Sequence, residues 1–172
     1  MTVPQVHKSQ RELRVLSEEF ENTGERLLDL YRRDVIANAY DNADPDTLRR
    51  LMQDVDGILP TLADLRDRFA VIARPATEVE IGDHLAVMRL NFHNSKAAGA
   101  YASIMVDRAI AKAPSFAAIE WATRDCIDTR KFMPVTAEVL EMIANAQGRL
   151  NSIRDVIATL PARRAAMAKR IE

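Results

Sequence analysis

Residues 139–160 read VLEMIANAQGRLNSIRDVIATL, and an apolar residue returns in this stretch at alternating steps of four and three. The members of this series are Val139, Ile143, Ala146, Leu150, Ile153, Ile157 and Leu160. A spacing of about 3.5 residues is the heptad pattern of α-helices that pack along one seam. The stretch therefore predicts a long final helix with a buried seam. Pro161 is expected to kink or end this helix, and a last short helix is expected to follow.

A second stripe of the same kind lies in a helix expected over residues 9–38. Its members are Leu13, Leu16, Phe20, Thr23, Leu27 and Leu30. Each stripe needs a partner. Either the first and last helices pair within the chain, or the last helix pairs with its copy in a homo-oligomer, and both arrangements bury the same residues.

The sequence between the two stripes divides into shorter helices at breaking and capping signals. These signals are Asp44-Pro45, Arg74-Pro75-Ala76, the capping box Thr77/Glu80 and Ala113-Pro114-Ser115. Residues 41–45 are expected to form a turn, and residues 93–96 a polar connector. No segment shows the alternation of a β-strand. The expected fold is therefore an all-α multi-helix bundle with long first and last helices that carry heptad-like, coiled-coil stripes.

Composition and charge suggest three segments: an N-terminal helical segment (1–76), a compact helical domain (77–146) and a basic C-terminal tail (147–172). The tail carries 6 basic and 2 acidic side chains. A basic tail can be steered toward nucleic acid, and its candidate contacts are Arg149, Arg154, Arg163, Arg164, Lys169 and Arg170. The alternative is a solvated helix end whose cations complement the helix dipole.

The overall composition is that of a globular protein, with 48% hydrophobic and 28% charged residues among 172. No apolar run approaches the roughly 20 residues that cross a bilayer, and the first residues lack the apolar core of a signal peptide. A single cysteine, Cys126, cannot form an internal disulfide. These features predict a protein without membrane association in a reducing cytoplasm.

Sites of chemistry are not apparent in the sequence. The glycines are isolated, so no phosphate-binding loop is expected. His7, His84 and His93 show no metal-ligand spacing. Cys126 shares an apolar helix face with Ile119, which is typical of an inert buried thiol. We therefore expect no catalytic residue, no metal and no cofactor.

Trp121 lies about 200° around its helix from Ile119, away from the main apolar stripe. One interpretation is a second buried face that packs against the long final helix. The other is a partly exposed anchor for a protein partner. In that case Arg124, Arg130 and Lys131 would complete the binding surface, because aromatic and arginine side chains carry much interface energy.

Several short motifs between residues 81 and 145 carry a family resemblance. They are a helix with Tyr101, Met105 and Asp107, the helix start Pro114-Ser115-Phe116-Ala117-Ala118-Ile119, and the loop Lys131-Phe132-Met133-Pro134 before Ala137-Glu138-Val139. The segment resembles a prophage-associated helical protein of phage replication modules. Its phenylalanine–proline loop is similar to the N-terminal region of phage helicase loaders and helicase inhibitors.

This resemblance implies a non-catalytic replication accessory protein that binds a replicative helicase, DNA or both. The loop also has a structural interpretation, in which Phe132 plugs the core and Pro134 fixes the first helical φ. The alternative function is a coiled-coil oligomeric adaptor, or a regulator that sequesters a host factor without binding nucleic acid.

Overall fold

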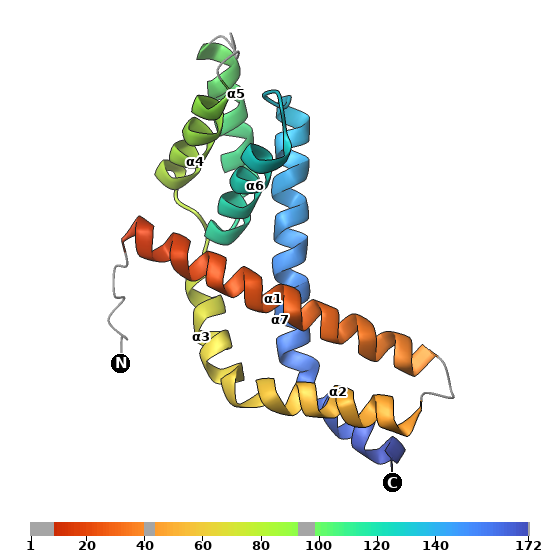
Figure 1. Ribbon diagram of the computed structural model, residues 1–172. Helices are drawn as coiled ribbons and strands as arrows, with labels where there is room; N and C mark the ends of the chain where they lie inside the picture. Colours follow the sequence, from red (N-terminus) through yellow and green to blue (C-terminus); the bar gives the residue numbers. More distant parts are fainter. Residues whose placement is uncertain (1–8, 40–43, 93–98, 172) are drawn as a thin grey trace, which may run out of the picture. The chain divides into compact units, whose positions relative to one another are not determined.

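A computed structural model of the chain describes residues 9–39, 44–92 and 99–171 (Figure 1). The described residues form helices and no strand: α1 (Gln10–Ala39), α2 (Pro45–Ile58), the 3-10 turn η1 (Leu59–Thr61), α3 (Leu62–Ile72), α4 (Glu78–Asn91), α5 (Gly99–Ile110), α6 (Phe116–Thr129) and α7 (Thr136–Ile171). The predicted all-α fold with long first and last helices is confirmed. The connector at 93–96, most of the turn at 41–45, and His7 lie outside the described residues.

The predicted caps form at three helix starts. Asp44 accepts a hydrogen bond from the Asp46 N–H, with Pro45 in the first turn of α2. Thr77 and Glu80 form a reciprocal capping box at α4. The Ser115 side chain accepts from the N–H of Ala118 in α6. Each cap satisfies backbone donors that the first helical turn leaves free, which is why these helices begin where they do.

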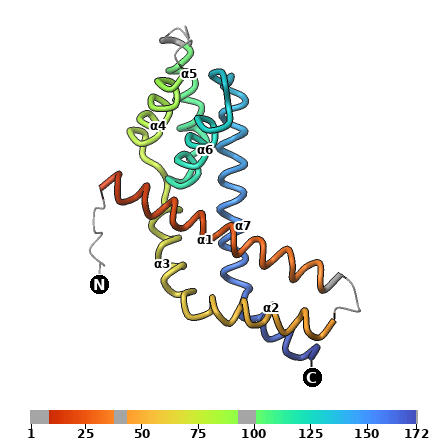
Figure 2. The backbone as a smooth tube through the Cα atoms, in the orientation of Figure 1, coloured from red at the N-terminus to blue at the C-terminus, as the bar shows by residue number. Residues whose placement is uncertain are grey.

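The helices belong to two compact units, each made of two separate stretches of chain. The first unit comprises Met1–Ser17 and Val71–Leu150, and the second Glu18–Ala70 and Asn151–Glu172. These units are divided differently from the predicted segments 1–76, 77–146 and 147–172. Both α1 and α7 are continuous helices, as Figure 2 traces, and each contributes residues to both units. A division of the chain into consecutive segments cannot describe units that each combine two separate stretches.

In the first unit α6 is the central helix, and α4 lies beside it (Figure 1). Every residue from Phe116 to Thr123 is buried, so this half of α6 is enclosed on all sides. Two backbone hydrogen bonds, from Ala76 N–H to the Pro114 carbonyl and from Phe116 N–H to the Arg74 carbonyl, each 2.9 Å, join the segments that precede α4 and α6.

In the second unit the apolar faces of α1, α2, α3 and α7 supply the core. Its buried members include Leu27, Leu30, Leu48, Leu51, Val55, Leu62, Leu65, Ile153, Ile157, Leu160 and Met167. Phe20 packs against Phe69, with ring centroids 6.0 Å apart. A Cβ at Gly24 would lie 3.0 Å from Ile153 Cγ1 and closer still to its Cδ1. Glycine at this position therefore lets α1 and α7 approach closely.

The heptad seam of α7 is buried inside the chain. Val139, Ile143, Ala146, Leu150, Ile153, Ile157 and Leu160 are all at most 5% exposed in a single copy. Gly24 of α1 meets this seam at Ile153 in the second unit, so part of the seam has a partner within the chain. The seam consequently offers no surface for a homo-oligomer in this conformation.

The prediction that a separate short helix follows Pro161 is wrong. Helix α7 continues through Pro161 to Ile171. A proline inside a helix removes one hydrogen bond and costs about 3 kcal/mol. Tertiary contacts beyond it oppose this cost, since Met167 is buried and Arg163 and Arg164 pair with carboxylates of the same unit.

Candidate functional site

The loop between α6 and α7 exposes two large apolar side chains. Phe132 is 76% exposed and Val135 is 58% exposed, whereas Pro134 between them is buried. The structural interpretation in which Phe132 plugs the core is therefore wrong. Arg130 and Lys131 are exposed in the same loop, as the partner-binding hypothesis requires. The loop thus combines an exposed aromatic ring with two cations.

Fixed contacts hold this loop at the start of α7. The Tyr101 hydroxyl donates to the Pro134 carbonyl at 3.0 Å, and the Val135 N–H donates to Glu138 Oε2 at 2.9 Å. Arg130 Nη1 lies 3.9 Å from Glu138 Oε1. Because both sides of the loop are tied to the first unit, Phe132 is presented from a supported backbone. Binding through a supported loop loses less conformational entropy than binding through a free one.

Trp121 does not belong to this surface. Its side chain is 0% exposed, its Nε1–H donates to Ser17 Oγ at 2.9 Å, and the Arg149 guanidinium lies 4.9 Å from its ring centroid. The prediction of an exposed anchor is wrong, and the buried interpretation describes this residue. A helix that is apolar on every face is enclosed by its neighbours. Ala117, Ala118 and Ala122 extend the apolar surface around the first half of α6, and all three are buried.

A buried polar chain extends from Trp121, and the sequence did not suggest it. Ser17 Oγ accepts from Trp121 and donates to Glu120 Oε2 at 3.1 Å. Glu120 is 7% exposed, and Arg124 Nη1 lies 3.4 Å from its Oε1. Arg124 is therefore engaged with a carboxylate of its own helix. The feature of the sequence that could have indicated this chain is Ser17, a polar residue on the apolar face of α1 between Leu13 and Phe20.

The candidate nucleic-acid contacts are mostly engaged with carboxylates of the same chain. Arg163 lies 2.8 Å from Asp34 and 4.3 Å from the centroid of the Tyr31 ring. Three other arginines pair with carboxylates: Arg149 with Asp125 at 3.6 Å, Arg154 with Asp155 at 2.8 Å and Arg164 with Asp56 at 2.9 Å. Lys169 and Arg170 are exposed. Such pairs offset the charge that would attract phosphate groups.

The Arg164–Asp56 and Arg74–Glu80 pairs also shift side-chain pKa values. Arg164 donates two hydrogen bonds to Asp56, and this bonding lowers the pKa of the Asp56 carboxyl. Hydrogen bonds from Arg74 lower the pKa of Glu80 to about 2, against a partly offsetting effect of burial. Arg74 and Glu80 both belong to the first unit, and Arg164 and Asp56 both belong to the second, so each pair is a structural contact within its own unit.

The remaining titratable candidates are buried. Cys126 is 0% exposed, as predicted, and burial raises the pKa of its thiol. His84 is 4% exposed and packs edge-on against Phe116, with centroids 5.7 Å apart. In the described part of the chain no three His, Cys, Asp or Glu side chains are placed to hold a metal ion. None of the helices described is long and apolar enough to cross a membrane.

We expect the burial of His84 to make the protein less stable in mild acid. Burial lowers the pKa of His84 from 6.5 to about 4, and the charge of Arg14 contributes in the same direction. Between these values the unfolded chain binds a proton that the folded chain excludes. The free energy of unfolding should therefore fall as pH decreases from about 6.5 toward 4. Urea unfolding at several pH values measures this slope.

His84→Gln should remove that part of the slope. A variant whose stability still falls with the wild-type slope between these pH values would contradict the assignment to His84. The Glu80 carboxyl titrates lower, between 4.5 and about 2, so acid loss below pH 4 is a separate effect that His84→Gln retains.

Comparison with protein-family models, with curated proteins and with solved structures finds no match for this chain.

Proposed function

We propose that this chain is a non-catalytic binding protein that docks on a protein partner through the loop of residues 130–135. The observation that carries the proposal is the exposure of Phe132 and Val135 on a loop that Tyr101 and Glu138 hold in place. An exposed aromatic ring beside arginine and lysine has the composition of a protein interface centre. This is also the loop on which the resemblance to phage replication proteins depends, so the proposed partner is a replicative helicase.

A protein partner is favoured over DNA by the state of the basic residues. Four of the six candidate DNA contacts are paired with carboxylates in the structure. A pair that must open before an arginine reaches a phosphate reduces the gain from releasing counterions. The oligomeric-adaptor alternative has less support, because the seam it would use is buried within one copy.

Phe132→Ser should weaken binding to a cognate replicative helicase at least about tenfold, the effect of losing one well-packed aromatic contact. Leu90→Ser in α4 is the matched control, because Leu90 is also 76% exposed. It should bind like the wild type. Biolayer interferometry on immobilised helicase measures both, and circular dichroism should give melting temperatures close to the wild-type value for both variants.

Two results would count against the proposal in different ways. A wild-type chain that does not bind helicase would exclude this partner class. A Phe132→Ser variant that binds as tightly as the wild type would exclude the loop as the docking surface. Strong, salt-dependent binding to a labelled oligonucleotide that is lost in Arg163→Gln would instead favour DNA as the partner.

A further inference from the structure

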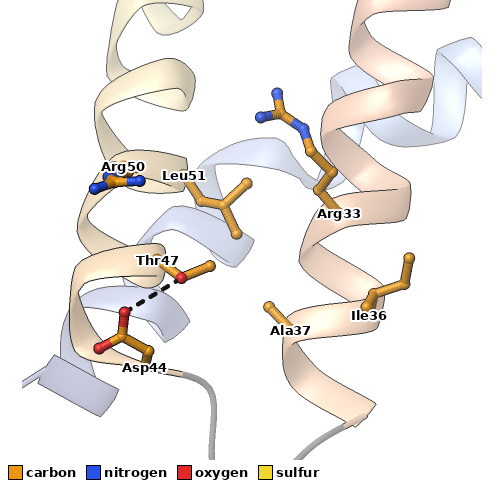
Figure 3. A pocket seen from close by; sticks show the side chains of 7 residues that line it. All are labelled: Arg33, Ile36, Ala37, Asp44, Thr47, Arg50 and Leu51. Atoms are coloured by element: carbon orange, nitrogen blue, oxygen red, sulfur yellow. Dashed lines mark hydrogen bonds between the residues drawn. The ribbon is translucent and has the colours of Figure 1, made fainter.

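A pocket of about 400 Å³ opens between α1 and α2 in the second unit. In Figure 3 Ala37, Thr47 and Leu51 lie between the two helices, and Ile36 and Arg50 lie at opposite edges. Ala37 and Leu51 are 9% and 4% exposed and form an apolar floor, whereas Ile36 is 58% exposed. The volume falls within the range of small-molecule sites.

The charges around the pocket differ in how far they are compensated. Arg33 also lines the pocket, and it lies 3.2 Å from Asp29 and 3.2 Å from Asp54. Asp44 is engaged in capping α2, since it accepts from the Asp46 N–H at 3.3 Å and from Thr47 Oγ1 at 3.5 Å. These two lining groups therefore have local partners.

Arg50 is the exception. Within the described residues, no hydrogen bond or ion pair holds its guanidinium. Its neighbour Arg49 is paired with Asp46. The pocket thus has an apolar floor, an exposed isoleucine at one edge and an uncompensated cation at the other.

We propose that this pocket binds a small amphipathic anion: an apolar body that covers Ile36, Ala37 and Leu51, with one carboxylate or sulfonate group beside Arg50. The guanidinium fork matches the geometry of an acidic group with two or three oxygens. Burial of the apolar body removes the Ile36 side chain from water. The pocket shares no residue with the loop of residues 130–135, so this ligand site is independent of the proposed partner.

Fluorescence titration with anilinonaphthalene sulfonate tests the site in the full-length chain, and phenylnaphthylamine serves as the uncharged counterpart. We expect saturable binding of the sulfonate and weaker binding of the amine. Decanoate should displace the sulfonate, whereas decylamine, with the same alkyl chain and the opposite charge, should not.

Two pairs of variants separate charge from apolar contact. Arg50→Gln should weaken sulfonate binding at least about tenfold, as expected for loss of one charged hydrogen bond. It should leave the uncharged probe unchanged, and Arg49→Gln should leave both probes unchanged. Ile36→Ser should weaken both probes, and its neighbour Val35→Ser, at a position 42% exposed but outside the pocket lining, should weaken neither.

Several outcomes would overturn the assignment. A wild-type chain that binds neither probe at millimolar concentration has no such site. If Arg50→Gln and Arg49→Gln weaken sulfonate binding equally, the effect comes from the general positive charge of the surface and not from a contact with Arg50. Undiminished binding in Ile36→Ser would place the probe elsewhere. Circular dichroism of each variant should match the wild type, since all four substitutions fall on exposed positions.

Discussion

We expect Leu150→Ala and Ile153→Ala each to lower the free energy of unfolding by about 2–5 kcal/mol, the usual cost of emptying a core position. Both side chains are 0% exposed. Leu150 belongs to the first unit and Ile153 to the second, so the two variants report on different cores. Since a domain is stable by only about 5–15 kcal/mol, each loss removes a large fraction of the stability of its own unit. Urea unfolding followed by circular dichroism measures each loss.

Light scattering on the same variants tests where the seam is buried. Because one copy already buries the seam, the wild type and both single variants should have the same mass at every concentration. Arg154→Ala on the same helix is the control, since Arg154 is exposed and pairs with its neighbour Asp155. It should cost no more than about 1 kcal/mol. A wild-type dimer that dissociates in Leu150→Ala would show instead that the seam joins two chains.

The parts of the fold that depend on local chemistry could be predicted from the sequence. Helix starts at Asp44, Thr77 and Ser115 depend on a side chain that caps its own backbone within three residues. The α7 seam depends on a repeat that only a buried helix maintains over three heptads. Both signals are contained in short stretches of sequence, and the structure has the three caps and the buried α7 seam.

Features that depend on distant segments could not be predicted. Arg163 meets Asp34 across 129 positions, and Arg164 meets Asp56 across 108. An excess of basic residues in the tail therefore does not indicate how many of them are available to bind nucleic acid. The two units are likewise assembled from separate stretches of chain, and a division made in chain order separates residues that pack together.

Trp121 is buried and Phe132 is exposed, the reverse of what one interpretation of each residue expects, and this reversal has a specific physical cause. The sequence pattern indicates one main apolar stripe on α6, and Trp121 lies away from it, which leaves an exposed position as one of its two interpretations. The alanines of α6 allow neighbouring helices to approach on every side, and all of Phe116–Thr123 is buried. The structural interpretation of the loop places Phe132 in the core because it precedes a proline at a helix start. In the structure Pro134 takes the buried position and Phe132 remains outside.

Trp121→Ala should therefore be among the most destabilising single substitutions in the chain, at about 3–5 kcal/mol for a buried aromatic. The loss includes the ring volume, the hydrogen bond to Ser17 and the contact with Arg149. Trp121→Phe retains most of the volume and removes the Nε1 donor. In a double-mutant cycle with Ser17→Ala, Trp121→Phe should show a coupling of about 1 kcal/mol for that hydrogen bond.

Phe132→Ala is the matched substitution on the surface, because Phe132 is 76% exposed. It should change the free energy of unfolding by no more than about 0.5 kcal/mol, as is usual away from the core, while it weakens partner binding. Trp121 is the single tryptophan of the chain, so its fluorescence in Phe132→Ala follows unfolding directly, and circular dichroism serves for Trp121→Ala. A stable Trp121→Ala variant that loses partner binding would reverse the two assignments, because only an exposed tryptophan can be removed without loss of stability and still contribute to an interface.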